Sequence, residues 1–219
     1  MNNIYKLVKF DYILIKEYLK TAIYLLLIAL MLTASSKSLI GGLVTAITIV
    51  SLRLTSLPFE TEEKNTIEQF YGFIPVSKKQ RVTGRFASII ALGIISLMVS
   101  IILQIITLTV IGVDIKFQEL MIGVFISSVI YIINISLQIP AYYKYGAIKA
   151  RIISFIPLIG FSLFYFIFNK LDNYLINISK IFINSNMYFN LITIITSVFS
   201  IVIIIISLKV SNIIYDRKE

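Results

Sequence analysis

The stretch IFINSNMYFNLITIITSVFSIVIIIISL, residues 181–208, contains no charged residue. A helix needs about 20 apolar residues to cross the hydrocarbon core of a bilayer, so this stretch predicts a membrane-spanning helix. The rest of the chain has the same character, with 58% hydrophobic residues, 14% charged residues and a mean hydropathy of +0.92. A soluble domain carries roughly 25% charged residues. We therefore expect an integral membrane protein with an all-α fold.

Five more charge-free stretches precede this one, at 21–36, 38–52, 86–113, 120–143 and 152–169. The first two are short because Lys20, Lys37 and Arg53 interrupt them, but such side chains at helix ends can extend toward the lipid headgroups. We expect residues 1–219 to form a single transmembrane domain. Its six transmembrane helices are expected near 18–36, 38–57, 84–112, 119–139, 151–169 and 188–208.

The distribution of lysine and arginine predicts the orientation of these helices. Most of them fall in the N-terminal segment, between the second and third spans, between the fourth and fifth, and at the C-terminus. The other loops hold only Lys37, Lys116, Lys170 and Lys180. Basic residues concentrate on the cytosolic side of membrane proteins. Both termini are therefore expected inside, and the net charge of +9 reflects topology rather than nucleic-acid binding.

The segment before the first span, residues 1–17, has a basic face. At 100° per residue, Lys6, Lys9, Lys16 and Lys20 share one arc, and most apolar residues lie away from it. This pattern is typical of an amphipathic helix on the inner membrane surface, although a charged flank of the first span would look similar. Asp11 lies on the apolar side, where we expect a helix break or an N-cap.

Residues 58–83 are the only polar stretch long enough for a structured element outside the membrane. Pro58 followed by acidic residues favours a helix start, and Gly72 and Pro75 would end that helix. Ser77 and Gln80 have the spacing of a capping box, which predicts a new helix leading into the third span. The aromatic residues between the helices suggest a protein partner, or else they lie in the membrane interface and the acids form a solvated face.

The sequence FETEEKNTIEQFYGFIPVSKKQRVTGRF, residues 59–86, resembles the cytosolic coupling region of bacterial ATP-binding-cassette type-2 exporter permeases. The groups Glu-Glu-Lys-Asn at 62–65 and Pro-Val-Ser-Lys at 75–78 carry most of the likeness. The six spans and the basic N-terminal helix are similar as well. Within that family the chain resembles the small permeases of phenol-soluble modulin exporters.

The resemblance implies a permease subunit in the bacterial plasma membrane that exports an amphipathic substrate of the peptide class. Its partners would be two ATPase subunits that bind ATP and Mg, a second permease copy or paralogue, and membrane lipid. The coupling region would dock in a groove of the ATPase, through Glu60, Glu62, Glu63, Lys64, Asn65, Phe70 and Tyr71. The chain itself has no phosphate-binding Gly-x-x-x-x-Gly-Lys-Ser/Thr pattern and needs no cofactor of its own.

A few polar residues lie inside the expected spans and mark either a transport pathway or helix contacts. These candidates are Gln104, Asn134, Gln138 and Asn190. Pro157, with Gly160 nearby, should kink the fifth span. Residues 170–187 have helical apolar spacing and predict an amphipathic segment in the outer leaflet.

Three other functions compete with peptide export. The chain has no cysteine or histidine, which removes Cys/His metal sites and the histidine that a Glu-Glu intramembrane protease requires. We therefore expect no catalytic and no metal-binding residues. A self-protection or drug-efflux permease and a membrane scaffold that does not transport remain alternatives. A stable complex with an ATPase would distinguish either permease from the scaffold.

Overall fold

The fold is that of a helical bundle, seen in a computed structural model that describes residues 3–16, 19–64, 76–155 and 186–217. Over these residues the chain forms helices and no strand, which confirms the all-α prediction. The helices are α1 (Asn3–Lys16), α2 (Leu19–Ser36), α3 (Leu39–Leu54), α4 (Leu57–Lys64), α5 (Lys78–Ile111), α6 (Phe117–Tyr145), α7 (Ala147–Ser154) and α10 (Asn186–Asp216).

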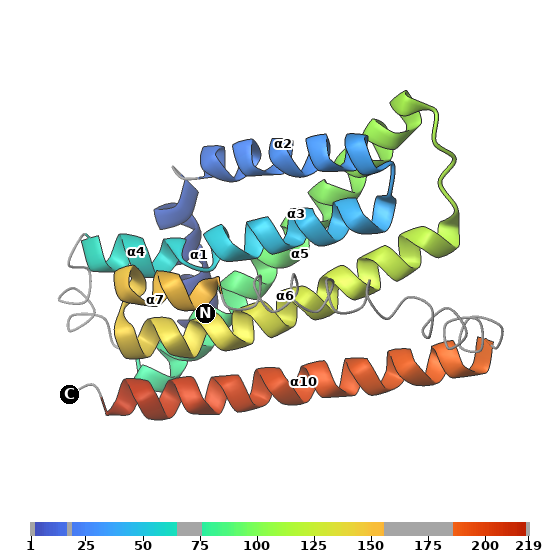
Figure 1. Cartoon of the computed structure of the whole chain (residues 1–219). Coiled ribbons are helices and arrows are strands. Elements are labelled where there is room, and N and C mark those ends of the chain that lie inside the picture. Colours follow the sequence, from blue (N-terminus) through green and yellow to red (C-terminus); the bar gives the residue numbers. More distant parts are fainter. Residues whose placement is uncertain (1–2, 17–18, 65–75, 156–185, 218–219) are drawn as a thin grey trace.

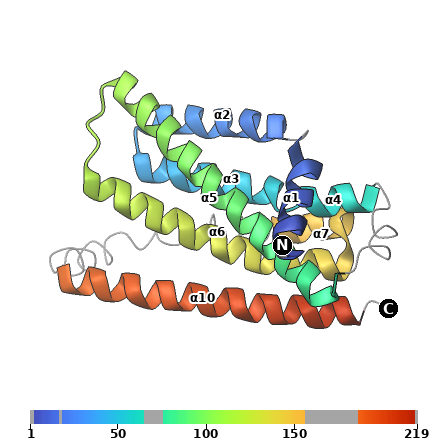
Figure 2. The ribbon, with the colours of Figure 1, turned by 180° about the vertical axis from the view of Figure 1, so that it is seen from behind.

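The long helices lie side by side, with α3 in the middle. It contacts α2, α5 and α6, while α10 lies on the outer side of α6 (Figures 1 and 2). The short helices α1, α4 and α7 gather at one end of the bundle, together with the start of α5 and the ends of α6 and α10 (Figure 1). We call this the α4 end. The connections 37–38 and 112–116 lie at the opposite end.

Four segments of the described chain are long and apolar enough to cross a membrane: Leu39–Lys64, Lys78–Ile111, Phe117–Tyr145 and Thr193–Asp216. A shorter apolar helix, Tyr24–Ser36, lies within the expected first span. Most of the expected fifth span, with Pro157 and Gly160, lies outside the described residues. So does the expected outer segment, except for its last two residues, which belong to α10.

The limits of α5 agree closely with the sequence. Ser77 is its N-cap and forms the predicted capping box with Gln80, in which each side chain accepts a hydrogen bond from the other residue's backbone N–H. Gly112 ends the helix with φ 81°, a left-handed conformation that glycine adopts without strain. The predicted helix restart at Ser77 is therefore confirmed, and α5 continues from it directly into the span.

Two helices end a few residues away from the limits expected for their spans. The second span was expected to reach residue 57, but α3 ends at Leu54 and α4 begins at Leu57, just before Pro58. The fourth span was expected to end at 139, but α6 continues through Pro140 to Tyr145. Tyr142 and Tyr143 are buried beyond the proline. Their packing holds the last turns in helical form despite the hydrogen bond that proline removes.

The N-terminal helix forms as predicted, but the expectation for Asp11 was wrong. Lys6, Lys9 and Lys16 are exposed on α1, whereas Leu7 and Ile15 are buried. Asp11 neither breaks nor caps this helix. It lies in the middle of α1 and is only 3% exposed, which is stable only if a partner charge balances it.

Candidate functional site

The helix α4 turns most of its polar residues into the protein. Leu57, Phe59 and Thr61 are buried, and Glu60 and Glu62 are only 4% and 9% exposed. A solvated acidic face, which the sequence left open, is therefore wrong for these two glutamates. Buried carboxylates are retained only where cations or hydrogen-bond donors meet them, and such groups surround α4.

Glu62 joins α4 to the start of α5 through two arginines. Arg81 Nη2 donates to Glu62 Oε1 at 3.0 Å, and Arg85 Nη2 donates to Glu62 Oε2 at 2.6 Å. On its other side, Arg85 Nη1 lies 2.9 Å from Asp11 Oδ1 of α1. Two acids and two bases thus form one compensated group, which we call the charge cluster.

Replacing a single residue of the charge cluster should destabilise the protein. The Arg85 side chain is 3% exposed, so its positive charge depends on Asp11 and Glu62 rather than on water. Ser88, one turn further along α5, adds a hydrogen bond from Oγ to Asp11 Oδ2 at 2.6 Å. Removing one partner of a buried ion pair leaves an uncompensated charge, which is strongly destabilising.

Aromatic rings extend the cluster to α6 and α10. The ring centroid of Phe59 lies 5.1 Å from those of Tyr142 and Tyr143, and Tyr143 lies 5.2 Å from Tyr215 of α10. The Arg85 guanidinium stands 5.0 Å above the Phe59 ring. Arg81 stands 5.4 Å above the Tyr215 ring and also hydrogen-bonds the Tyr215 hydroxyl. These contacts connect α4 to both neighbouring helices.

A further ion pair bridges the junction between α3 and α4. Arg53 Nη1 donates to both carboxylate oxygens of Glu60, at 3.0 and 3.1 Å. Pro58 cannot donate to the helix ladder at this point, yet the Glu60 N–H still bonds the Ser56 carbonyl at 2.9 Å. Helices α3 and α4 are therefore joined across a junction that Pro58 weakens, and the ion pair between Arg53 and Glu60 spans this junction.

Glu63 reaches from α4 to the beginning of α7. Its Oε2 accepts hydrogen bonds from the backbone N–H of Ala147 at 2.8 Å and of Ile148 at 3.4 Å. The first N–H groups of a helix have no partner within it and carry partial positive charge. A carboxylate supplied by another helix satisfies them here, so Glu63 caps α7 from outside its own segment.

The expected docking residues are thus divided into two groups. Glu60, Glu62 and Glu63 contact other parts of this chain, whereas Lys64 is exposed at the end of α4. Asn65, Phe70 and Tyr71 lie outside the described residues. The sequence analysis missed Arg53, Arg81, Arg85, Asp11 and Tyr215. A lone acid on an apolar helix face and two arginines four residues apart were the available signals.

The polar residues inside the bundle make contacts between helices. Gln104 Nε2 donates to the Gly42 carbonyl at 3.2 Å. Asn134 Nδ2 donates to Ser51 Oγ at 2.9 Å, and Gln138 Oε1 accepts from Thr55 Oγ1 at 2.6 Å. All three residues are buried, and each makes a hydrogen bond to a neighbouring helix. Asn190 lies in the first turns of α10, and its side chain is outside what the structure describes.

Apolar helices long enough to cross a bilayer, with buried charges collected at one end, define a multi-pass membrane protein. No group of three or more acidic side chains in the described ranges is placed to hold a metal ion.

Residues 6–216 match the family model described as ABC-2 family transporter protein, and the chain belongs to this family. It is the non-catalytic membrane permease component of a transporter whose partner subunits are ATPases. No curated protein and no solved structure matches the chain.

Proposed function

We propose that this chain is the permease subunit of an exporter in the bacterial plasma membrane. It moves amphipathic peptides, such as phenol-soluble modulins, out of the cell or the membrane. The likeness of residues 59–86 to the permeases of modulin exporters supports this substrate class. The span residues Gln104, Asn134 and Gln138 are uncharged and hydrogen-bonded between helices, which favours an apolar, amphipathic cargo over an ion.

The topology that we propose has six spans with both termini in the cytosol. The α4 end of the bundle carries Lys6, Lys9, Lys64, Lys78 and Lys79, whereas the described part of the opposite end carries Lys37 and Lys116. This difference follows the preference of basic residues for the cytosolic side. In this orientation α4 faces the ATPase subunits.

The coupling mechanism that we propose rests on one observation: the glutamates of α4 are bonded to α3, α5 and α7. Glu62 reaches Arg81 and Arg85 of α5, and Arg85 continues to Asp11 of α1. Glu63 holds the start of α7. ATP-driven movement of a docked segment comprising Lys64, Asn65, Phe70 and Tyr71 would displace α4, and these bonds would carry the displacement into the spans.

The assembly that we propose contains two ATPase subunits and a second permease, either identical or a paralogue. ATP and Mg bind to the ATPases, and this chain holds no cofactor. The amphipathic peptide moves between the permeases.

The proposal is tested with the complete transporter in inside-out vesicles, by measuring ATP hydrolysis and uptake of a fluorescent phenol-soluble modulin together. The wild type should accumulate the peptide only with ATP. Glu63→Gln weakens the bond to α7 without burying a new charge, and should lower uptake severalfold while hydrolysis continues. Glu119→Gln, in the first turn of α6 at the opposite end, is the matched control and should behave as the wild type.

Two outcomes would contradict the proposal. Hydrolysis without any modulin uptake in the wild type would exclude this substrate, and uptake of an antimicrobial peptide instead would favour the self-protection permease. An unchanged ratio of uptake to hydrolysis in Glu63→Gln would exclude the coupling role of that residue.

A further inference from the structure

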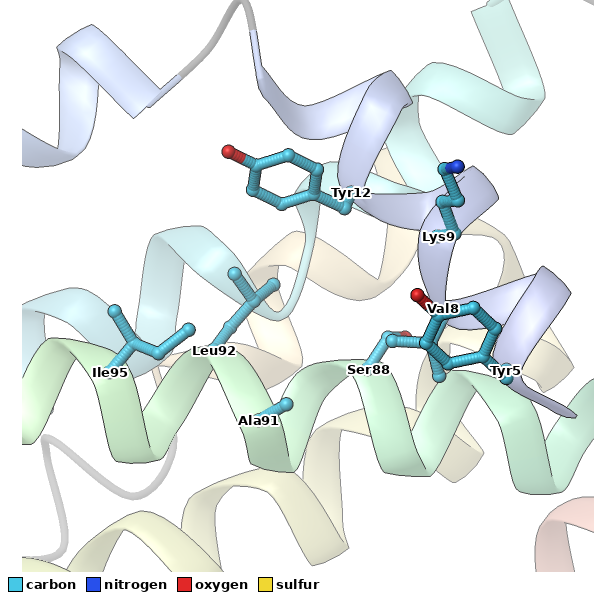
Figure 3. Close-up of a pocket in the computed structure, with 8 residues that line it drawn as sticks. All are labelled: Tyr5, Val8, Lys9, Tyr12, Ser88, Ala91, Leu92 and Ile95. Carbon is cyan, nitrogen blue, oxygen red and sulfur yellow. The ribbon is translucent and has the colours of Figure 1, made fainter.

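A crevice of about 230 Å³ opens between α1 and α5, at the α4 end of the bundle (Figure 3). Four lining residues come from the N-terminal helix and four from the span. They are Tyr5, Val8, Lys9 and Tyr12 of α1, and Ser88, Ala91, Leu92 and Ile95 of α5.

The crevice exists because α1 is fastened to α5 along a neighbouring edge. Leu7 lies against Gly84, where an added Cβ would come within 3.0 Å of the leucine side chain. Asp11 is bonded to Arg85 and Ser88, and Ile15 is fully buried. Tyr5, Lys9 and Tyr12 lie on a different face of α1 from these contact residues. The crevice lies between that face and α5.

The lining divides into an apolar floor and a polar mouth. Val8, Ala91, Leu92 and Ile95 supply hydrocarbon, and in Figure 3 Leu92 and Ile95 point from α5 toward the side where Tyr12 lies. Lys9, Tyr5 and Tyr12 are exposed at the mouth and offer one ammonium and two hydroxyl groups. Lys9 is the only charged residue among those that line the crevice. The neighbouring Arg85 is not part of the lining, and its charge is compensated by Asp11 and Glu62.

The floor continues along the exposed face of α5. Ile95 is followed at helical spacing by Met98, Ile102 and Ile106, all of them exposed. At 1.5 Å per residue, the distance from residue 95 to 106 is roughly 16 Å. This is close to the roughly 15 Å depth of one leaflet's hydrocarbon, so an acyl chain that enters the crevice can lie along this column.

We propose that the crevice binds an anionic phospholipid. Its phosphate meets the Lys9 ammonium, and one acyl chain lies on Ala91, Leu92 and the α5 column. The exposed Lys6 and Lys16 on the same helix repel the cationic group of a zwitterionic lipid, which favours a headgroup with net negative charge. The site goes beyond the transport function, because it lets lipid composition act on the helix that holds Asp11 and hence on the charge cluster.

The test uses the complete transporter in nanodiscs of phosphatidylglycerol and phosphatidylcholine, with either lipid carrying a photoreactive group on its acyl chain. Cross-links are mapped by mass spectrometry, and adducts on the exposed residues 194–199 of α10 measure general lipid contact. We expect the phosphatidylglycerol probe to label residues 91–95 well above this background. The phosphatidylcholine probe should label them at background level.

Three variants locate the contacts. Lys9→Gln should reduce phosphatidylglycerol labelling about fivefold, because a lysine near an anionic surface contributes about 1 kcal/mol. Ala91→Phe fills the floor and should reduce labelling to background. Lys116→Gln, at the opposite end of the bundle, is the control and should retain the wild-type signal.

Equal labelling by both lipids, or an unchanged signal in Lys9→Gln, would overturn the proposal. Displacement of the lipid probe by an amphipathic peptide at low concentration would overturn it too, since the crevice would then be a peptide site. Modulin uptake is measured separately, so failure of the lipid site leaves the transport proposal standing.

Discussion

Glu62 is the residue through which α4 is held most firmly. Its two carboxylate oxygens accept from different arginines, at 3.0 and 2.6 Å. Because Arg81 and Arg85 are one helical turn apart on α5, one carboxylate can bridge both. The arrangement also fixes α1, since Arg85 pairs with Asp11 on its other side. One side chain thus determines how three helices meet.

We predict that Glu62→Gln destabilises the protein by about 3 kcal/mol, the cost of breaking a buried ion pair. The amide keeps the shape of the side chain but leaves Arg85 with one counter-charge instead of two. Thermal unfolding of the purified transporter in detergent measures the loss. The control is Lys64→Gln, a change of one charge at an exposed position two residues away. Equal melting temperatures for the two variants would show that the cluster is not stabilising.

Local residue roles could be predicted from the sequence, and partners distant along the chain could not. The capping box at Ser77 and Gln80 depends on residues three apart, so their spacing was sufficient. The pairing of Asp11 with Arg85 joins residues that only the tertiary fold brings together. The acid on an apolar face signalled that a partner was needed, but not which one.

At the scale of elements, the apolar patterns placed the long helices well. The expected third span lies within α5, and the fourth and sixth spans lie within α6 and α10 to within a few residues. Errors arose where packing overrode local signals. The α6 helix passes Pro140 because buried tyrosines beyond it hold the helix. The polar composition of α4 suggested solvent, whereas its glutamates meet arginines of α3 and α5 and backbone N–H groups of α7.

The bond between α4 and α7 gives a prediction of its own. Glu63→Gln replaces a charged acceptor at the Ala147 and Ile148 N–H groups with a neutral one, and hydrogen bonds to charged groups are the stronger kind. We expect hydrogen exchange at these two amides to become about tenfold faster, which corresponds to 1.4 kcal/mol. Mass spectrometry of a peptide that begins several residues earlier, such as 142–154, measures it. In the control Glu119→Gln, exchange in this peptide should stay at the wild-type rate, and an equal rate in Glu63→Gln would exclude the cap.

At the scale of the whole molecule, charged contacts collect at the end where α1, α4 and α7 lie. The asymmetry of lysine and arginine along the sequence predicted one distinct end of the bundle, and the described residues place those segments together (Figure 1). The sequence could not predict that the coupling segment is bonded to the spans, because that depends on how the helices pack. In the coupling mechanism that we propose, these bonds carry a displacement of α4 into the spans.

The most direct test of the account places a photo-cross-linker at the end of α4. The chain has no cysteine, so Lys64→Cys and Lys116→Cys each supply one attachment site for a benzophenone maleimide. Lys116 is exposed at the opposite end of the bundle. In the assembled transporter, illumination should join residue 64 to the ATPase subunit and should not join residue 116 to it. An ATPase adduct from residue 116, or none from residue 64, would contradict the claim that α4 receives the force of ATP hydrolysis.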